Sequence, residues 1–171
     1  MSLSRLLFLV ALGVVGALIL RATVGEGIYI ASASMEPSLH VGTHLVLDKL
    51  TFLFRSPRRG DIISFVGPMA PYEELVKRVI AVAGETVELR EKKVYVNGAA
   101  LDEPYAQHKR AEERLKGDSL GPLEVPKEHL FVLGDNRDES KDSSVWKDPA
   151  TGEAKPFVPL SRVRGIVRGF Y

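Results

Sequence analysis

The chain has 171 residues and a formal net charge of +1, and hydrophobic residues make up 45% of it. This is the composition of a folded globular protein, long enough for one domain with a sizeable core and a small appendage. The near-neutral charge indicates no nucleic-acid partner. Because the chain contains no cysteine, disulfide scaffolds, thiol nucleophiles and cysteine-ligated metal sites are excluded.

The first predicted element is an apolar helix near the N-terminus. Residues 6–20 read LLFLVALGVVGALIL between Arg5 and Arg21. A bilayer core takes about 20 apolar residues, a length reached if Arg21 snorkels and the span continues to residue 24. We therefore expect residues 1–25 to form a cytoplasmic tip and one transmembrane helix, with residues 6–24 in the lipid bilayer. The alternative is a cleavable signal peptide, but no small-x-small site directly follows Arg21.

Residues 26–171 have the composition of a β-rich domain. Short β-branched and aromatic runs, separated by Gly and Pro turns, predict strands. These runs cover residues 28–30, 44–47, 61–65, 75–82, 86–89, 93–96, 129–133 and 163–167. We expect a mostly β protein with an antiparallel sheet or barrel-like domain, because no long helical period follows residue 26.

One part of this domain differs in composition. Residues 102–128 are rich in charge and contain three prolines, which predicts an exposed loop. Just before them, Asn97 and Gly98 predict a hairpin turn. We therefore expect residues 87–127 to be a hairpin and loop excursion inserted into the domain.

A serine-rich segment follows the first predicted strand. Residues 32–39 read SASMEPSL, so Ser32 and Ser34 alternate at the end of an apolar strand that Pro37 stops. Alternation places both serines on one face. Ser34 can then attack a carbonyl while its own amide and the Ser32 hydroxyl donate to the oxyanion. Taken alone, an ordinary polar strand end explains this pattern as well.

Lys77 interrupts an apolar run, since residues 75–82 read LVKRVIAV. A lysine in this position can simply snorkel to solvent. If it is buried instead, desolvation lowers its pKa, and the neutral amine can accept a serine proton, as in Ser–Lys variants of serine proteases.

A dense polar loop, GDNRDESKDSS, occupies residues 134–144. Loops of this kind are usually solvated. The loop offers many oxygen ligands, but it does not fit the EF-hand template, because Gly and Glu are missing at the required positions. A further possibility is that Ser140 orients the lysine amine by a hydrogen bond and that Asp142 supports it from behind.

Taken together and in this order, the segments resemble type I signal peptidases, also called leader peptidases. The matching segments are SASMEPSL (32–39), RGDIISF (59–65), KRVIAVAGE (77–85), KVYVNGAALDEPY (93–105) and GDNRDESKDS (134–143). The likeness spans almost the whole chain. It implies a membrane-bound serine endopeptidase that cleaves the signal peptides of exported preproteins after small-x-small sites, with no metal and no cofactor.

The resemblance also implies a role for each matching residue. Ser34 would be the nucleophile, Lys77 the general base and Ser32, with the Ser34 amide, the oxyanion hole. The supporting or orienting residues would be Ser140, Asp142, Asp135 and Arg78. An extended peptide beside residues 32–34 and 74–77 would meet a shallow apolar pocket. We expect that pocket to be lined by Ile30, Leu75 and Val76.

Two features depart from the family pattern. Ser144 stands where many members have Arg, and residues 147–156 (KDPATGEAKP) form an insertion that we expect to be a surface loop. The resemblance places the chain in a bacterial inner or plasma membrane as a single-pass protein, with its catalytic domain on the extracytoplasmic side. An organellar inner membrane is the alternative.

Three competing hypotheses fit the sequence less well. A self-cleaving Ser–Lys protein of the repressor type would carry a helix-turn-helix segment. A Ser-His-Asp hydrolase would carry a Gly-x-Ser-x-Gly elbow, which this sequence lacks. A membrane-tethered β domain that only binds partners would give Lys77 an ordinary pKa near 10.4.

Overall fold

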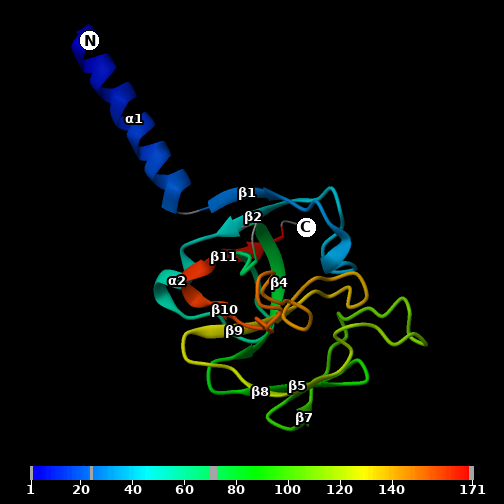
Figure 1. Cartoon of the computed structure of the whole chain (residues 1–171). Helices are drawn as coiled ribbons and strands as arrows, with labels where there is room; N and C mark the ends of the chain where they lie inside the picture. The colour runs from blue at the N-terminus through cyan, green and yellow to red at the C-terminus, as the bar shows by residue number, and fades with distance from the viewer. Residues whose placement is uncertain (1, 24, 70–72, 170–171) are drawn as a thin grey trace.

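The computed structural model describes residues 2–23, 25–69 and 73–169. Helix α1 (Leu3–Thr23) projects from a β-rich domain (Figure 1). Its large apolar side chains from Leu3 to Leu18 are exposed. Within the described residues, no helix meets the length and hydropathy of a membrane span. The helix is therefore present as expected, its place in a bilayer stays a prediction, and residue 24 lies outside the described residues.

The main sheet has seven strands in the order β1-β2-β11-β3-β4-β9-β10, and every pairing is antiparallel. The strands are β1 (Gly25–Tyr29), β2 (His44–Asp48), β3 (Ile62–Val66), β4 (Glu74–Val82), β9 (His129–Leu133), β10 (Val158–Pro159) and β11 (Val163–Arg168). This confirms the mostly β, antiparallel prediction. The sheet is curled and open, because β1 and β10 remain at its two edges.

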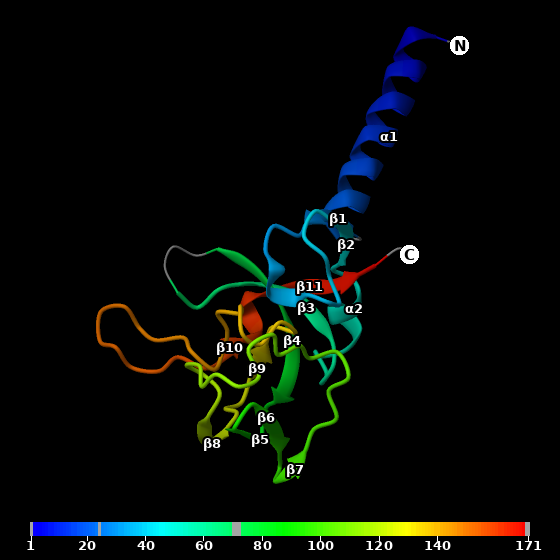
Figure 2. The same ribbon diagram turned by 90° about the vertical axis from the view of Figure 1, so that its right-hand side faces the viewer.

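A second sheet of four strands, in the order β7-β6-β5-β8, lies at the end of the domain away from α1 (Figure 2). Its strands are β5 (Thr86–Arg90), β6 (Lys93–Val96), β7 (Ala99–Ala100) and β8 (Leu120–Glu124). Asn97 and Gly98 join β6 to β7 with φ of 52° and 80°, as the predicted hairpin turn requires.

Strand β8 corrects one expectation, because it falls within residues 102–128, which we predicted to be a loop. Leu120 and Leu123 are half-buried and pack against the core between the two sheets, while Pro122 stands on an edge strand where its missing N–H costs nothing. The prolines and charges in this stretch predicted a loop, although its two leucines hold a strand in place.

A cluster of buried apolar side chains fixes the serine-rich segment onto the sheet. Met35 is 1% exposed and packs with Ile30, Leu39, Leu45 and Leu47. Burying one such side chain contributes about 1.5–3 kcal/mol, so the cluster holds the short helical turn that contains Met35 firmly against β2. Two further short helices, α2 (Thr51–Phe54) and η2 (Leu160–Arg162), connect strands of the main sheet.

Candidate active site

Ser34 lies in a short 3₁₀ turn, η1 (Ala33–Met35), that faces strand β4. The expected strand end was wrong in this detail: Ser32 is extended, but the chain turns at Ala33 so that Met35 can enter the core. The two hydroxyls still meet, with the Ser32 and Ser34 Oγ atoms 3.2 Å apart. The turn thus places two polar side chains at one point, as a strand would have done.

Lys77 points from the middle of β4 at this turn. Its Nζ donates a hydrogen bond to Ser34 Oγ at 2.7 Å, and the residue is only 3% exposed. Burial lowers the pKa of Lys77 to about 8, against the opposing attraction of the Asp142 and Asp135 carboxylates. A lysine with this pKa is partly neutral near physiological pH and can accept a proton from the serine.

The polar loop of residues 134–144 lies near Lys77, since its Asp142 and Asp135 carboxylates act on the pKa of the lysine. Within it, the Asp142 carboxylate accepts hydrogen bonds from the Gly134 amide at 2.9 Å and from Ser144. The Ser144 amide and hydroxyl reach Asp142 at 3.1 and 2.8 Å. Ser144 therefore holds Asp142 by neutral hydrogen bonds.

An ion pair connects β4 to the same loop. Arg78, the residue after Lys77, donates two hydrogen bonds to Asp135, at 2.8 and 2.6 Å. Asp135 is fully buried. Two parallel hydrogen bonds between a guanidinium and a carboxylate fix distance and orientation together, so this pair sets the position of the loop relative to Lys77.

Asn136 is a residue that the sequence analysis missed. Its backbone amide donates to the Ser34 carbonyl and its side-chain Nδ2 to the Ala33 carbonyl, both at 3.1 Å. Asn136 thereby holds the backbone of the nucleophile turn. An asparagine in a charged loop is an ordinary turn residue, so only its place inside the matching segment GDNRDESKDS could have singled it out.

Ser140 is half-buried, and its buried hydroxyl oxygen has no hydrogen-bond partner among the described residues. It lies directly against Gly134, where an added Cβ would clash with the Ser140 side chain and come within 2.5 Å of the Ser34 carbonyl oxygen. The structure therefore brings Ser140 next to the Ser34 turn, while its expected bond to the lysine stays a prediction.

Residues 3–171 match the family model described as signal peptidase, peptidase S26. The chain belongs to this signal peptidase family. The resemblance read from the five sequence segments is thereby confirmed, and family membership indicates a serine endopeptidase.

Individual signal peptidases support this assignment. The chain is 38% identical over 157 residues to probable signal peptidase I-2 of Synechocystis sp., a match that covers 89% of this chain and 65% of that protein. It is 34% identical over 165 residues to signal peptidase I T of Bacillus subtilis, with 91% and 85% covered. A crystal structure of a signal peptidase I from Enterococcus faecalis matches with a TM-score of 0.51 and 32% identity, over 67% of this chain and 98% of that one.

The three predicted pocket residues of this signal peptidase family member separate in the structure. Ile30 and Val76 both contact the apolar cluster around Met35. Leu75 packs instead against the cluster that contains Ile63, because neighbouring strand residues point to opposite faces. The structure thus brings two of the three to one buried apolar cluster, while the pocket itself stays a prediction.

The remaining features lie away from the dyad. Residues 147–156 form a projecting surface loop, drawn in orange, that is closed by an ion pair between Asp148 and Lys155 (Figure 2). Among the described residues, no group of three or more His, Asp or Glu side chains could hold a metal ion.

Proposed function

We propose that the chain is a membrane-bound serine endopeptidase that removes the signal peptides of exported preproteins, with Ser34 as nucleophile and Lys77 as general base. The observation that carries the proposal is the 2.7 Å hydrogen bond between the Nζ of a buried lysine and the Ser34 hydroxyl. Burying a lysine beside a serine hydroxyl costs stability, and proton transfer between them accounts for that cost.

The proposed reaction begins when neutral Lys77 accepts the Ser34 proton as Oγ attacks the scissile carbonyl carbon. The oxyanion that forms is stabilised by the Ser34 N–H and the Ser32 hydroxyl. The Lys77 ammonium then gives its proton to the leaving amine, and a water molecule, deprotonated by Lys77, releases the acyl group from Ser34. The Ser140 hydroxyl accepts a lysine N–H and fixes the amine between these steps, with Asp142, Asp135 and Arg78 holding the surrounding loop.

The substrate docks as an extended chain along β4. Strand β9 pairs with β4 only from Arg78 to Val82, and within the described residues no strand pairs with Glu74–Lys77 on that side. A peptide that adds to this open edge brings its carbonyl toward Ser34. Val76, which is half-buried and packs against the cluster that contains Ile30, lies next to this edge, and we propose that it meets the small side chains of a small-x-small cleavage site.

The membrane part of the proposal concerns residues 1–25. The exposed leucine, valine and phenylalanine side chains of α1 have no protein surface to cover them among the described residues. We assign residues 6–24 to the lipid bilayer and residues 26–171 to a catalytic domain on the extracytoplasmic side, with residues 87–127 as an excursion within it. Protease digestion of sealed, oriented vesicles tests this placement, because the catalytic domain is digested from its own side only.

The decisive experiment mixes the detergent-solubilised protein with a preprotein that carries an Ala-x-Ala site. Wild type, Ser34→Ala and Lys77→Met are compared, with Ser161→Ala as a control at an exposed serine of η2. Mass spectrometry locates the cut. We expect cleavage after the last alanine by wild type and control alone. Equal cleavage by Ser34→Ala removes this serine from the mechanism, and no cleavage by folded wild type rejects the activity.

A further inference from the structure

A segment of the excursion (residues 87–127) lies across the polar loop of residues 134–144, on the side opposite the serine turn. We call residues 103–110 the strap. The Gln107 amide donates to the Asp135 carbonyl at 2.7 Å, and the Arg137 amide donates to the Gln107 carbonyl at 3.0 Å. Between these two bonds stands Asn136, which holds Ser34 from the other side. The loop is therefore enclosed between the strap and the nucleophile turn.

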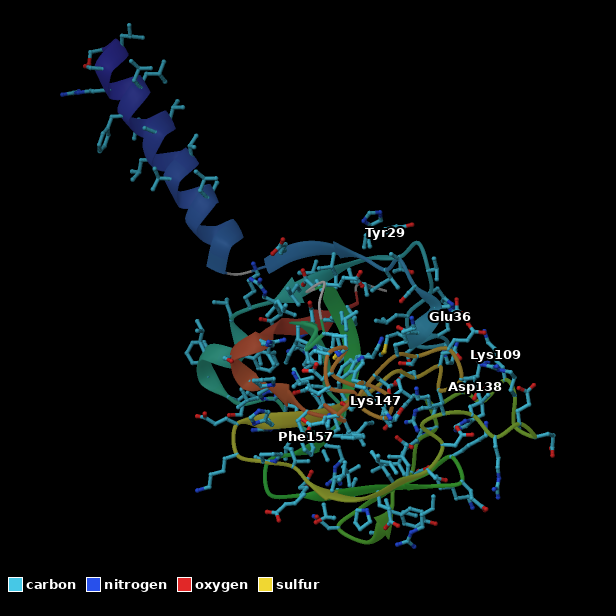
Figure 3. The ribbon with its side chains drawn as sticks, in the orientation of Figure 1. Tyr29, Glu36, Lys109, Asp138, Lys147 and Phe157 are labelled. Atoms are coloured by element: carbon cyan, nitrogen blue, oxygen red, sulfur yellow. The ribbon has the colours of Figure 1, made fainter. Side chains whose placement is uncertain are left out.

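The far end of the strap reaches the same region by charged contacts. Lys109 Nζ lies 3.6 Å from the Glu36 carboxylate, directly after the serine turn, and the Arg110 amide donates to Asp138 at 2.6 Å. Glu36, Lys109 and Asp138 gather at one end of the domain (Figure 3). The strap thus contacts both the nucleophile segment and the loop that carries Ser140.

Glu103 occupies the near end of the strap and binds two other side chains. Its carboxylate accepts two hydrogen bonds from Arg137, at 3.1 and 2.5 Å, and one from the Tyr105 hydroxyl at 3.1 Å. The Glu103 and Arg137 side chains are 8% and 7% exposed. Arg137 also donates from Nε to the Gly134 carbonyl at 3.0 Å. Glu103 is therefore connected to the first residue of the loop.

Tyr105 joins this pair to strand β4. The Arg78 guanidinium stacks on its ring, with Cζ 3.9 Å from the ring centroid. Burial and the nearby Glu103 carboxylate raise the pKa of Tyr105, so its hydroxyl keeps its proton for the bond to Glu103. The ring thus covers Arg78, the neighbour of Lys77, while the hydroxyl connects to the Arg137 side of the loop.

These groups are expensive to bury if packing is their only purpose. Apolar side chains would join the strap to the loop without the desolvation of two guanidinium and two carboxylate groups. The polar network fixes the orientation of the loop, which apolar contacts would not. Arg78 binds Asp135 by two parallel hydrogen bonds, and Arg137 binds Glu103 in the same way. Orientation matters most next to a dyad whose two atoms must stay within hydrogen-bond distance.

We propose that Tyr105 is a positioning residue of the catalytic site, whose ring, stacked on the Arg78 guanidinium, holds Arg78 on Asp135 so that Lys77 stays in contact with Ser34. The proposal rests on the proposed function of the dyad. The contacts of Tyr105 with Arg78 and Glu103 are those through which it acts on the loop and on Lys77.

The test compares Tyr105→Leu with Tyr105→Phe, which keeps the ring over Arg78. Tyr105→Met, whose flexible apolar side chain can fill the space without an aromatic face, serves if the leucine variant folds poorly. The matched control is Tyr95→Leu, because Tyr95 stacks under Arg90 in the same way, with Cζ 4.6 Å from the ring centroid, in the second sheet. Each variant is measured for kcat, KM and melting temperature on the preprotein substrate.

We expect Tyr105→Leu to lower kcat about 10- to 100-fold, as small misplacements of catalytic groups do, with KM changed less than about twofold. Tyr105→Phe should stay within about fivefold of wild type, and Tyr95→Leu should equal it. An unchanged kcat in Tyr105→Leu or Tyr105→Met overturns the proposal. So does a phenylalanine variant as slow as the leucine variant, since the ring would then not be the positioning element.

A second readout does not depend on cleavage. NMR titration of the Lys77 amine should show a higher pKa in Tyr105→Leu, because an Arg78 that leaves Asp135 exposes Lys77 to an uncompensated carboxylate. Ser34→Ala distinguishes a failure of the proposed dyad from a failure of the role of Tyr105. If Ser34→Ala cleaves like wild type, the dyad is wrong, and the Lys77 titration alone then tests the role of Tyr105. An unchanged Lys77 titration in Tyr105→Leu then refutes that role.

Discussion

Replacing Lys77 by methionine should make the protein inactive and more stable at neutral pH. Methionine has nearly the same shape as lysine and fills irregular space in a core. The change removes an ammonium group that is 3% exposed in β4. The hydrogen bond to Ser34 is lost, but Ser34 Oγ keeps the Ser32 hydroxyl at 3.2 Å as a neighbour.

The size of the effect follows from the pKa of Lys77. The difference between about 10.4 in an unfolded chain and about 8 in the fold corresponds to about 3 kcal/mol. Below pH 8 the lysine is charged in both states, and the folded state bears this whole cost. Losing one hydrogen bond offsets about 1 kcal/mol. We therefore expect Lys77→Met to raise the free energy of unfolding by about 2 kcal/mol near pH 7.

The sign of the difference should reverse at high pH. Between about pH 8 and pH 10.4 the unfolded lysine binds more protons than the folded one, so wild-type stability rises with pH while that of Lys77→Met gains nothing from this group. Above that window the variant should be about 1 kcal/mol less stable, because only the lost hydrogen bond remains.

Urea unfolding of both proteins from pH 6 to pH 10.5 measures this difference directly. Lys49→Met is the control, because Lys49 pairs with Glu26 at the surface and its removal should give no comparable pH-dependent gain. A variant that is less stable than wild type at pH 7, or a difference that does not change with pH, would refute the assignment of a desolvated lysine.

Three further predictions concern the same site. The rate kcat/KM should rise about tenfold per pH unit and level off near pH 8, because Lys77 must lose its proton to act as a base; a pH–rate profile of the wild type checks this. Asn136→Ala removes the side-chain donor to the Ala33 carbonyl, which keeps the Glu36 amide as its second donor, so we expect a loss of about 1 kcal/mol in urea unfolding together with a lower kcat. Gly134→Ala places a Cβ about 2.5 Å from the Ser34 carbonyl oxygen, so the melting temperature should fall by the equivalent of about 1–3 kcal/mol, whereas Gly27→Ala, which meets open space, should not lower it comparably.

Most strands could be predicted from the sequence because their apolar runs are short, β-branched and bounded by turn residues. The run from residue 75 to 82 corresponds to β4 (Glu74–Val82), and residues 129–133 to β9. Strand β8 could not be predicted, because it rests on two leucines that pack against residues from distant parts of the chain. The local sequence pattern indicates the conformational preference of a segment, whereas the formation of an edge strand depends on how its side chains pack against the neighbouring strand and core.

In the candidate site, too, some residues could be predicted from the local sequence and others could not. Ser34 and Lys77 could be singled out because each breaks an apolar pattern in a way that chemistry explains. Asn136, Glu103 and Tyr105 carry no such signal, because a turn asparagine and a charged residue near a proline are ordinary in loops. Their importance arises from pairings between residues far apart in the sequence, such as the bond from Asn136 to Ala33, which spans 103 positions.

The way polar groups are buried around Lys77 explains how the fold tolerates the lysine. Asp135 and Asp142 lie near it, and both raise its pKa, yet each carboxylate has its own donors. Asp135 is bound by Arg78, and Asp142 by Gly134 and Ser144. Because these donors compensate the carboxylates, neither acts as a full counter-charge to the lysine, and burial decides its pKa. The hydrogen bonds that hold the loop in place therefore also keep the lysine in the pKa range where it can act as a base.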